Sequence, residues 1–243
     1  MNNIGFGIFC FGEKYYYKGA EEKINELIKN DFPVYVLTDK PEYFSTLPVT
    51  TIHYTRTLKS YSDKIILLKH VLINHDICIL IDADTHVTDY SFLYSLKTYH
   101  FKKGISYADT LLNHSAKKQY VKDLINETNP EWKPYVEFVS KLYPNFGELE
   151  TMWEYFLVIN KEGFNMDSFY HYYEKLQIVK EYSDLPLKKE VNGAGEGISI
   201  QISCRLTNIE IDRDLQLYDL IKNKMTSISR RYTPKHLWPT WMI

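Results

Sequence analysis

The sequence predicts an α/β fold in which a mainly parallel, Rossmann-type sheet is flanked by helices. In residues 1–90, short apolar runs rich in β-branched residues alternate with helical patterns about ten residues long. That alternation is typical of βαβ units, whose strands pair in parallel. Beyond residue 90 the pattern loosens, which predicts a more irregular second half. We expect one domain over 1–243, with a nucleotide-binding half at 1–90, a second half at 91–219 and a tail at 220–243.

The first half is expected to contain four strands and two helices. The apolar runs predict strands at 4–11, 34–37, 49–54 and 77–81. Residues 20–29 are expected to be helical because Ile24, Leu27 and Ile28 share one helical face. Ser62 is a plausible N-cap for the second helix. Between these elements, Lys40 and Pro41 break the chain.

The second half carries weaker signals. Asp89 is expected to cap a short helix at 91–96. Further apolar runs and helical patterns predict strands at 103–108 and 155–159 and helices at 116–126 and 168–179. Three prolines predict an irregular, aromatic loop over 128–147, and a glycine-rich turn at 192–197 opens the apolar run 198–206.

Composition narrows the possible partners and compartments. The net charge of −2 gives no reason to expect nucleic acid as a partner. Three widely spaced cysteines, Cys10, Cys78 and Cys204, fit buried thiols in a reducing compartment. The amino terminus has no signal-peptide pattern, and no apolar run approaches 18 residues. We therefore expect a cytosolic protein, or one peripheral on a cytosolic membrane face.

Two carboxylates directly follow the apolar run 77–81. Asp82 and Asp84 are separated by one residue and lie at the strand's carboxyl end, where open α/β sheets bind ligands. They repel each other unless a proton or a cation relieves the repulsion. Mn²⁺ or Mg²⁺ is suited to this role and also holds substrate phosphates. The alternative is a strand that ends in a solvated turn.

Two segments resemble the core of GT-A-fold glycosyltransferases. They are YSDKIILL at 61–68, which carries Lys64, and HDICILIDADTHV at 75–87, which carries Asp82 and Asp84. The pattern is most similar to the glycogenin-like and lipooligosaccharide galactosyltransferase families, and it covers about residues 4–90. The resemblance implies transfer of a hexose from a nucleotide-sugar, with uridine as the expected base, to a glycan or lipid-linked acceptor. Asp82 and Asp84 would then bind the metal and the diphosphate.

The resemblance also suggests where the donor lies. Phe9, Cys10 and Phe11 end the first strand, where this fold meets the nucleotide. Asp39 would bind the base or ribose, or else be a turn residue before the chain break. Lys64 would lie near the diphosphate or the sugar, or else be a solvent-facing helix lysine. The run Tyr15–Tyr17 is a further candidate stacking surface.

The acceptor side and the tail supply the remaining candidates. Glu196 and Glu154 are expected to face the reacting carbon and the acceptor, although Glu196 could instead be an ordinary helix-start glutamate. In the basic, aromatic tail, Lys235 and His236 would close over the diphosphate, with His236 as a metal ligand. The tail could alternatively rest on an anionic membrane. No D-Q-D or H-D-E signature is present, so the anomeric outcome stays open.

Three other functions are weighed against this one. A haloacid-dehalogenase-like phosphatase would use Asp82 as its nucleophile, but it expects Thr or Val where His86 stands. A nicotinamide oxidoreductase is disfavoured because Gly5, Gly7 and Gly12 have the wrong spacing for its fingerprint. A non-catalytic nucleotide-sugar-binding module is the third alternative, and the intact acidic pair argues mildly against it.

Overall fold

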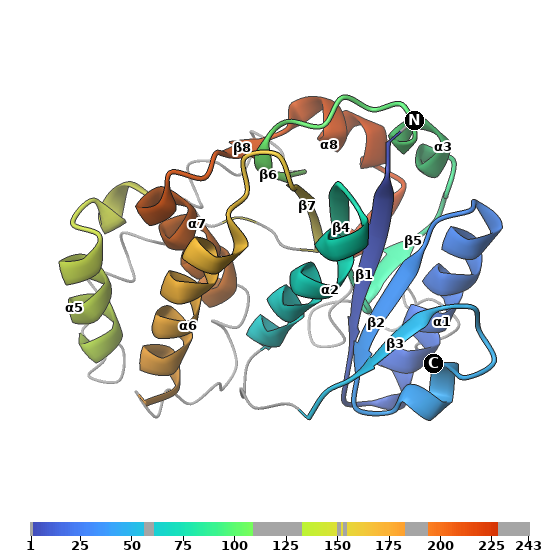
Figure 1. Cartoon of the computed structure of the whole chain (residues 1–243), viewed down its shortest axis with the longest axis horizontal. Coiled ribbons are helices and arrows are strands. Elements are labelled where there is room, and N and C mark those ends of the chain that lie inside the picture. Colours follow the sequence, from blue (N-terminus) through green and yellow to red (C-terminus); the bar gives the residue numbers. More distant parts are fainter. Residues whose placement is uncertain are drawn as a thin grey trace.

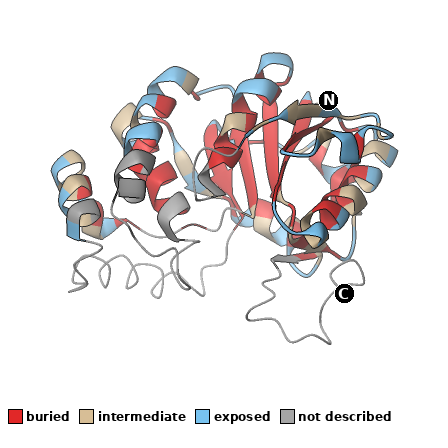
Figure 2. Cartoon of the chain, turned by 90° about the horizontal axis from the view of Figure 1, so that it is seen from below, coloured by how far each residue is buried: buried red, intermediate tan, exposed pale blue. Residues whose placement is uncertain are grey.

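The computed structural model describes residues 2–55, 61–108, 133–149, 152, 155–182 and 194–227. This part of the chain forms a seven-stranded sheet with the order β3-β2-β1-β4-β7-β6-β8, covered by helices on both faces (Figure 1). The sheet residues form the buried centre of the molecule (Figure 2). The expected α/β fold with a mainly parallel, helix-flanked sheet is confirmed.

The strand directions create one functional edge. The strands are β1 (Ile4–Cys10), β2 (Val34–Thr38), β3 (Thr50–His53), β4 (Ile77–Asp82), β6 (Gly104–Tyr107), β7 (Phe156–Asn160) and β8 (Ile211–Arg213). The first four are parallel, β7 is antiparallel to both β4 and β6, and β8 is parallel to β6. All strands except β7 therefore end at the same side of the sheet, which we call the carboxyl edge.

Two layers of helices bury the sheet. On one face, α1 (Lys14–Lys29), α3 (Phe92–Leu96) and α8 (Leu215–Ile221) pack against alternate residues of β1 and β4. On the other face, α2 (Ile66–Asn74), α6 (Met166–Tyr182) and α7 (Ala194–Thr207) cover the intervening residues. Burial on both faces explains why the strands are continuous apolar runs. The α5 helix (Lys133–Leu142) packs outside α6.

A second, two-stranded sheet joins distant parts of the chain. β5 (Thr85–Val87) follows the acidic pair and is antiparallel to β9 (Met225–Ser227). In this register Thr85 faces Ser227, so this part of the tail lies beside Asp84. Neither three-residue strand was expected from the sequence. No described helix has both the length and the apolar character needed to cross a bilayer.

Several local expectations were wrong. The first helix begins at Lys14 rather than at residue 20 because Gly19 is tolerated inside it. The run Tyr15–Tyr17 is therefore helical, and Tyr17 is buried rather than part of a stacking surface. Ser62 is not an N-cap, because it lies within the 3₁₀ helix η2 (Tyr61–Ile65) and the residue that caps α2 is Ile65.

The region expected to be an irregular loop at 128–147 contains α5 instead. Pro134 is the second residue of this helix, where a missing N–H leaves no helical hydrogen bond unmade. The predicted glycine-rich turn is wrong in part, since α7 already begins at Ala194. Asp89 accepts hydrogen bonds from the backbone N–H and hydroxyl of Ser91, each at 2.8 Å, although Ser91 is the N-cap of α3. The helix expected at 116–126 lies outside the described residues.

Candidate functional site

Three parallel strands bring predicted site residues to one place on the carboxyl edge. Phe9 in β1 pairs with Asp82, the last residue of β4, and Cys10 pairs with Thr38 at the end of β2. The carboxyl ends of β1, β2 and β4 are therefore aligned, and the residues that follow them leave the sheet side by side. This register explains why Phe11, Asp39 and Asp84 meet at the same edge although they are far apart in sequence.

Asp82 forms an ion pair with Lys64. The Lys64 Nζ lies 3.0 Å from Asp82 Oδ1, and the lysine side chain is only 4% exposed while that of Asp82 is 30% exposed. Lys64 comes from η2, directly before α2. The alternative of a solvent-facing lysine is therefore wrong. The pair fixes the orientation of the carboxylate, and within the described residues Asp82 Oδ2 accepts no hydrogen bond.

A second buried lysine supports the turn between the two aspartates. Lys23 on α1 is 2% exposed, and its Nζ donates to the carbonyl oxygens of Gly19 and Ala83, each at 2.9 Å. Burial lowers the pKa of Lys23 to about 8. Because α1 and α2 cover opposite faces of the sheet, the acidic pair is held from both sides by an ammonium group.

The electrostatics of the pair fit a divalent cation. Burial, followed by the negative charge of Asp82, raises the pKa of Asp84 to about 7. Ionising both carboxylates together is therefore costly, and a bound cation would offset that cost. Carboxylate oxygens are the ligands that Mg²⁺ and Mn²⁺ prefer. The described residues contain no group of three or more His, Cys, Asp or Glu side chains arranged for a metal.

Aromatic rings line the edge next to Asp82. The Phe9 and Phe11 rings stack with centroids 4.6 Å apart, and Tyr54 meets Phe11 edge-on at 6.4 Å. The Cys10 side chain points into the core on the other face, where burial raises the pKa of its thiol. Cys10 therefore offers only its backbone to the edge.

Asp39 is exposed at the end of β2 and accepts a hydrogen bond from the Tyr17 hydroxyl. This contact orients the carboxylate. The buried Tyr17 therefore positions Asp39 and does not stack on a ligand.

The structure locates the acceptor-side candidates only in part. Glu196 lies in the first turn of α7. A short connection joins α7 to β8, so α7 runs opposite to β8 and starts near the carboxyl edge. The position of Glu196 at a helix start fits both the predicted site residue and the alternative of an ordinary helix-start glutamate, and its side chain is outside the described set. Glu154, Lys235 and His236 also lie outside the described residues.

Lys23 was missed by the sequence analysis. The signal was present, because Lys23 stands on the same helical face as Ala20, Ile24 and Leu27, all of which are buried. A lysine on the apolar face of a helix must find acceptors inside the protein. The acceptors here belong to the helix itself and to the turn of the acidic pair.

Comparisons with known proteins give structural matches only. No family model and no curated protein matches the sequence. The chain resembles the apo structure of the bifunctional glycosyltransferase WbbM, at 12% identity and a TM-score of 0.47, over 83% of this chain and 37% of that one. It also resembles the galactosyltransferase LgtC in complex with donor and acceptor sugar analogs, at 10% identity and a TM-score of 0.49. That match covers 90% of this chain and 79% of the LgtC chain.

A third similar structure is the glycosyltransferase GlyE of Streptococcus pneumoniae TIGR4, at 13% identity and a TM-score of 0.43, over 89% of this chain and 46% of that one. This chain thus spans less than half the length of WbbM and of GlyE. At identities this low a likeness extends to the fold alone, so the chemistry has to come from the residues at the carboxyl edge.

Proposed function

We propose that the chain is a glycosyltransferase that moves a hexose from a nucleotide-sugar, with UDP as the nucleotide, to a glycan or lipid-linked acceptor. The observation that carries the proposal is the acidic pair at the end of β4, with Asp82 bound to the buried Lys64 and the following turn bound to the buried Lys23. This pair lies where open α/β sheets bind ligands.

On the donor side, each residue has a chemical part. Asp82 and Asp84 would hold Mn²⁺ or Mg²⁺, which when bound supplies positive charge to the departing diphosphate. Lys64 adds a fixed positive charge beside Asp82. The stacked Phe9 and Phe11 rings are only 6% and 5% exposed, so they would support the nucleotide site from the core side. The oriented carboxylate of Asp39 offers acceptors to ribose or base hydroxyl and N–H groups.

On the acceptor side, Glu196 and Glu154 would face the reacting carbon. A carboxylate there can orient the acceptor hydroxyl, take its proton or stabilise positive charge at the sugar carbon. Support for Glu196 comes from its place in the first turn of α7. The anomeric configuration of the product distinguishes retention from inversion.

The tail would complete the donor site. The pairing of Thr85 with Ser227 brings this part of the tail beside Asp84, which favours a role for Lys235 at the diphosphate and for His236 at the metal. We also propose a cytosolic location, with residues 220–243 as the segment that would contact a membrane carrying the acceptor.

A ligand screen tests this function. Thermal unfolding would be followed with each nucleoside diphosphate, with and without Mn²⁺. We expect selective stabilisation by UDP that requires Mn²⁺, by about 2.7 kcal/mol when the ligand is at 100 times its dissociation constant. Asp82→Ala and Asp84→Ala should lose both this stabilisation and sugar transfer. Asp219→Asn, an exposed change on α8, should keep both.

Three results would contradict the proposal. Hydrolysis of a simple phosphoester that depends on Asp82 and needs no nucleotide would indicate the phosphatase. Metal-dependent UDP-sugar binding without any turnover would indicate a binding module. Full transfer by both alanine variants in excess EDTA would remove the metal role.

A further inference from the structure

The two aspartates of the acidic pair are joined by a turn that lies between two sheets. β4 ends at Asp82, which pairs with Phe9 of β1, and β5 begins at Thr85, which pairs with β9. Ala83 and Asp84 form the turn between these strands. Strand pairing therefore fixes both ends of the turn, whereas the peptide unit that joins Ala83 to Asp84 lies outside both described sheets.

Lys23 holds this peptide unit from the α1 side. Lys23 is one of the buried residues of α1, together with Ile24 and Leu27, and α1 also packs against β5. The Lys23 ammonium group donates to the Ala83 carbonyl oxygen and to the Gly19 carbonyl oxygen, each at 2.9 Å. Lys23 and Ala83 are only 2% and 3% exposed. Loss of the ammonium group would therefore remove a donor from a carbonyl that water reaches poorly.

The direction of the Ala83 carbonyl determines how the chain enters Asp84. The Ala83 carbonyl and the Asp84 N–H belong to one planar peptide unit, so a contact that fixes the first also fixes the second. An aspartate side chain is short, and its carboxylate therefore follows its backbone closely. Lys64 orients the other carboxylate directly, through its ion pair with Asp82. Each aspartate thus has its own lysine, one acting on the side chain and one acting through the backbone.

We propose that Lys23 is a positioning residue, which places the Asp84 carboxylate for the divalent cation held with Asp82 by fixing the Ala83–Asp84 peptide unit. The inference rests on the proposed transferase function and assigns the residue that sets the metal affinity of that site. Metal–ligand distances are kept within about 0.2 Å, so a small shift of one carboxylate weakens binding. Residues that orient metal ligands typically contribute roughly 10- to 100-fold to metal affinity.

The charge of Lys23 has the opposite effect on a bound cation. The ammonium group interacts electrostatically with both Asp84 and Asp82, and a positive charge at this place repels Mn²⁺. If Lys23 acted only through its charge, its removal would strengthen metal binding. If Lys23 acts by holding the turn, its removal weakens metal binding. The direction of the change therefore distinguishes the two roles.

The test measures how much Mn²⁺ adds to the effect of UDP on stability. Urea unfolding of the full chain gives the free energy of unfolding with UDP alone and with UDP and Mn²⁺, and we call the difference the metal gain. We expect Lys23→Met to lower the metal gain by about 1.4 kcal/mol, which corresponds to tenfold weaker metal-dependent binding. The same measurements without ligand show whether the variant is folded and how stable it is.

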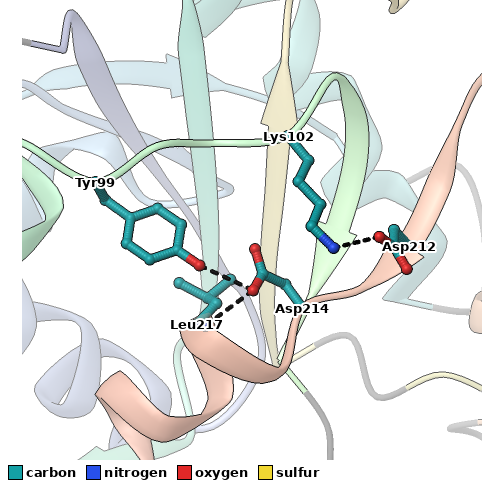
Figure 3. Close-up of polar contacts among 5 residues, drawn as sticks. All are labelled: Tyr99, Lys102, Asp212, Asp214 and Leu217. Carbon is teal, nitrogen blue, oxygen red and sulfur yellow. Dashed lines mark hydrogen bonds and ion pairs between the residues drawn. The ribbon is translucent and has the colours of Figure 1, made fainter.

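Two controls use contacts beside β8, away from the acidic pair (Figure 3). Lys102→Met makes the same change of residue type in an exposed ion pair, that of Lys102 with Asp212, and should change neither the stability without ligand nor the metal gain noticeably. Tyr99→Phe removes the hydroxyl that donates to the buried Asp214 at 2.8 Å. This variant should be less stable but keep its metal gain, so lost stability alone does not explain a lower gain.

An unchanged or increased metal gain in Lys23→Met would overturn the proposal. If that variant does not fold, Lys23→Gln takes its place, with the same expected loss. Its amide keeps a donor inside the protein, whereas its shorter, neutral side chain no longer holds the Ala83 carbonyl with a charge. Failure of the proposed function would be seen separately, as absence of any metal gain in the unaltered protein.

Discussion

At the scale of single residues, the acidic pair depends on its two lysines. Lys64 contacts Asp82 from the α2 face, and Lys23 contacts the intervening Ala83 carbonyl from the α1 face. Both ammonium groups are almost completely buried, so each must keep its acceptors to offset the loss of hydration. The site is therefore built before any ligand binds, which reduces the ordering cost of binding.

Lys64→Met tests the ion pair. We expect the free energy of unfolding to fall by about 1–3 kcal/mol because Asp82 loses its partner in a mostly buried place. Asp82→Asn removes that unpaired charge, so the double variant should lose less than the sum of the single losses, by about 1 kcal/mol. Denaturant unfolding of the four proteins measures this coupling.

Lys29→Met is the matched control, since the Lys29–Glu26 pair is exposed and should contribute less than about 0.5 kcal/mol. A loss for Lys64→Met as small as the control's would show that the buried pair does not stabilise the fold.

His75 predicts a pH dependence of stability. The residue is 8% exposed, and its ring has Nδ1 2.8 Å from Asn3 Oδ1 and Nε2 3.1 Å from the Tyr35 hydroxyl. Burial lowers the pKa of His75 below its ordinary value. The unfolded chain therefore binds the proton first, and stability present above about pH 6.5 is lost as the pH falls through the lowered pKa.

The free energy of unfolding of the unaltered protein should fall between pH 7 and pH 5. We expect a smaller fall in the His75→Gln variant, whatever the stability of that variant at pH 7. Denaturant titrations of both proteins at the two pH values measure the difference. An unchanged difference between pH 7 and pH 5 would show that His75 does not cause it.

At the scale of elements, the sequence predicts the strands of the first half well. β1, β2 and β4 are buried on both faces, so the apolar run and the strand coincide within two residues. The first helix was placed too late because Gly19 interrupts its pattern, although its buried face extends back to Tyr17. Local patterns thus locate elements whose burial is complete.

Elements defined by distant pairing could not be predicted. β5, β8 and β9 are three residues each, and β5 pairs with a strand about 140 residues later in the chain. Nothing local marks such segments as strands. For the candidate site, the same limit explains the outcome. Asp82 and Asp84 were predicted from their spacing after a buried strand and Lys64 from the family resemblance, whereas Lys23 joins the site only through packing.

Gly104→Ala tests one of these distant pairings. Gly104 opens β6 with φ +71°, and an added Cβ would lie 2.2 Å from the Glu210 carbonyl oxygen, which accepts from the Ile105 N–H. Both the backbone conformation and the close approach exclude a side chain. We expect a loss of about 2 kcal/mol or more in unfolding free energy, with β8 displaced.

Gly12→Ala is the comparison, because Gly12 also has a positive φ, +93°, but its nearest neighbour atom would be 3.9 Å from the new Cβ. It should lose only the conformational part, about 1 kcal/mol. Equal losses at the two positions would show that the approach of β8 to β6 is not important for stability.

At the scale of the whole molecule, one apolar cluster crosses the boundary between the two halves of the sequence. It contains Leu67 and Leu80 from the first half and Leu157 and Ile200 from the second. The central β4–β7 pairing links the same two halves by backbone hydrogen bonds. The candidate site at the carboxyl edge and the second half of the chain are thus carried by one continuous core, which argues that the two halves keep a fixed arrangement.

The three cysteines report whether that core unfolds as one unit. Cys10 and Cys78 lie in the first half and Cys204 in α7, all fully buried, and burial raises the pKa of each thiol. We expect none to react with a thiol reagent in the native protein, and all three to react over the same range of denaturant. Mass spectrometry of labelled peptides distinguishes them. Labelling of Cys204 at a lower denaturant concentration than Cys10 and Cys78 would contradict a single domain, because it would mean that α7 opens while the first half of the chain stays folded.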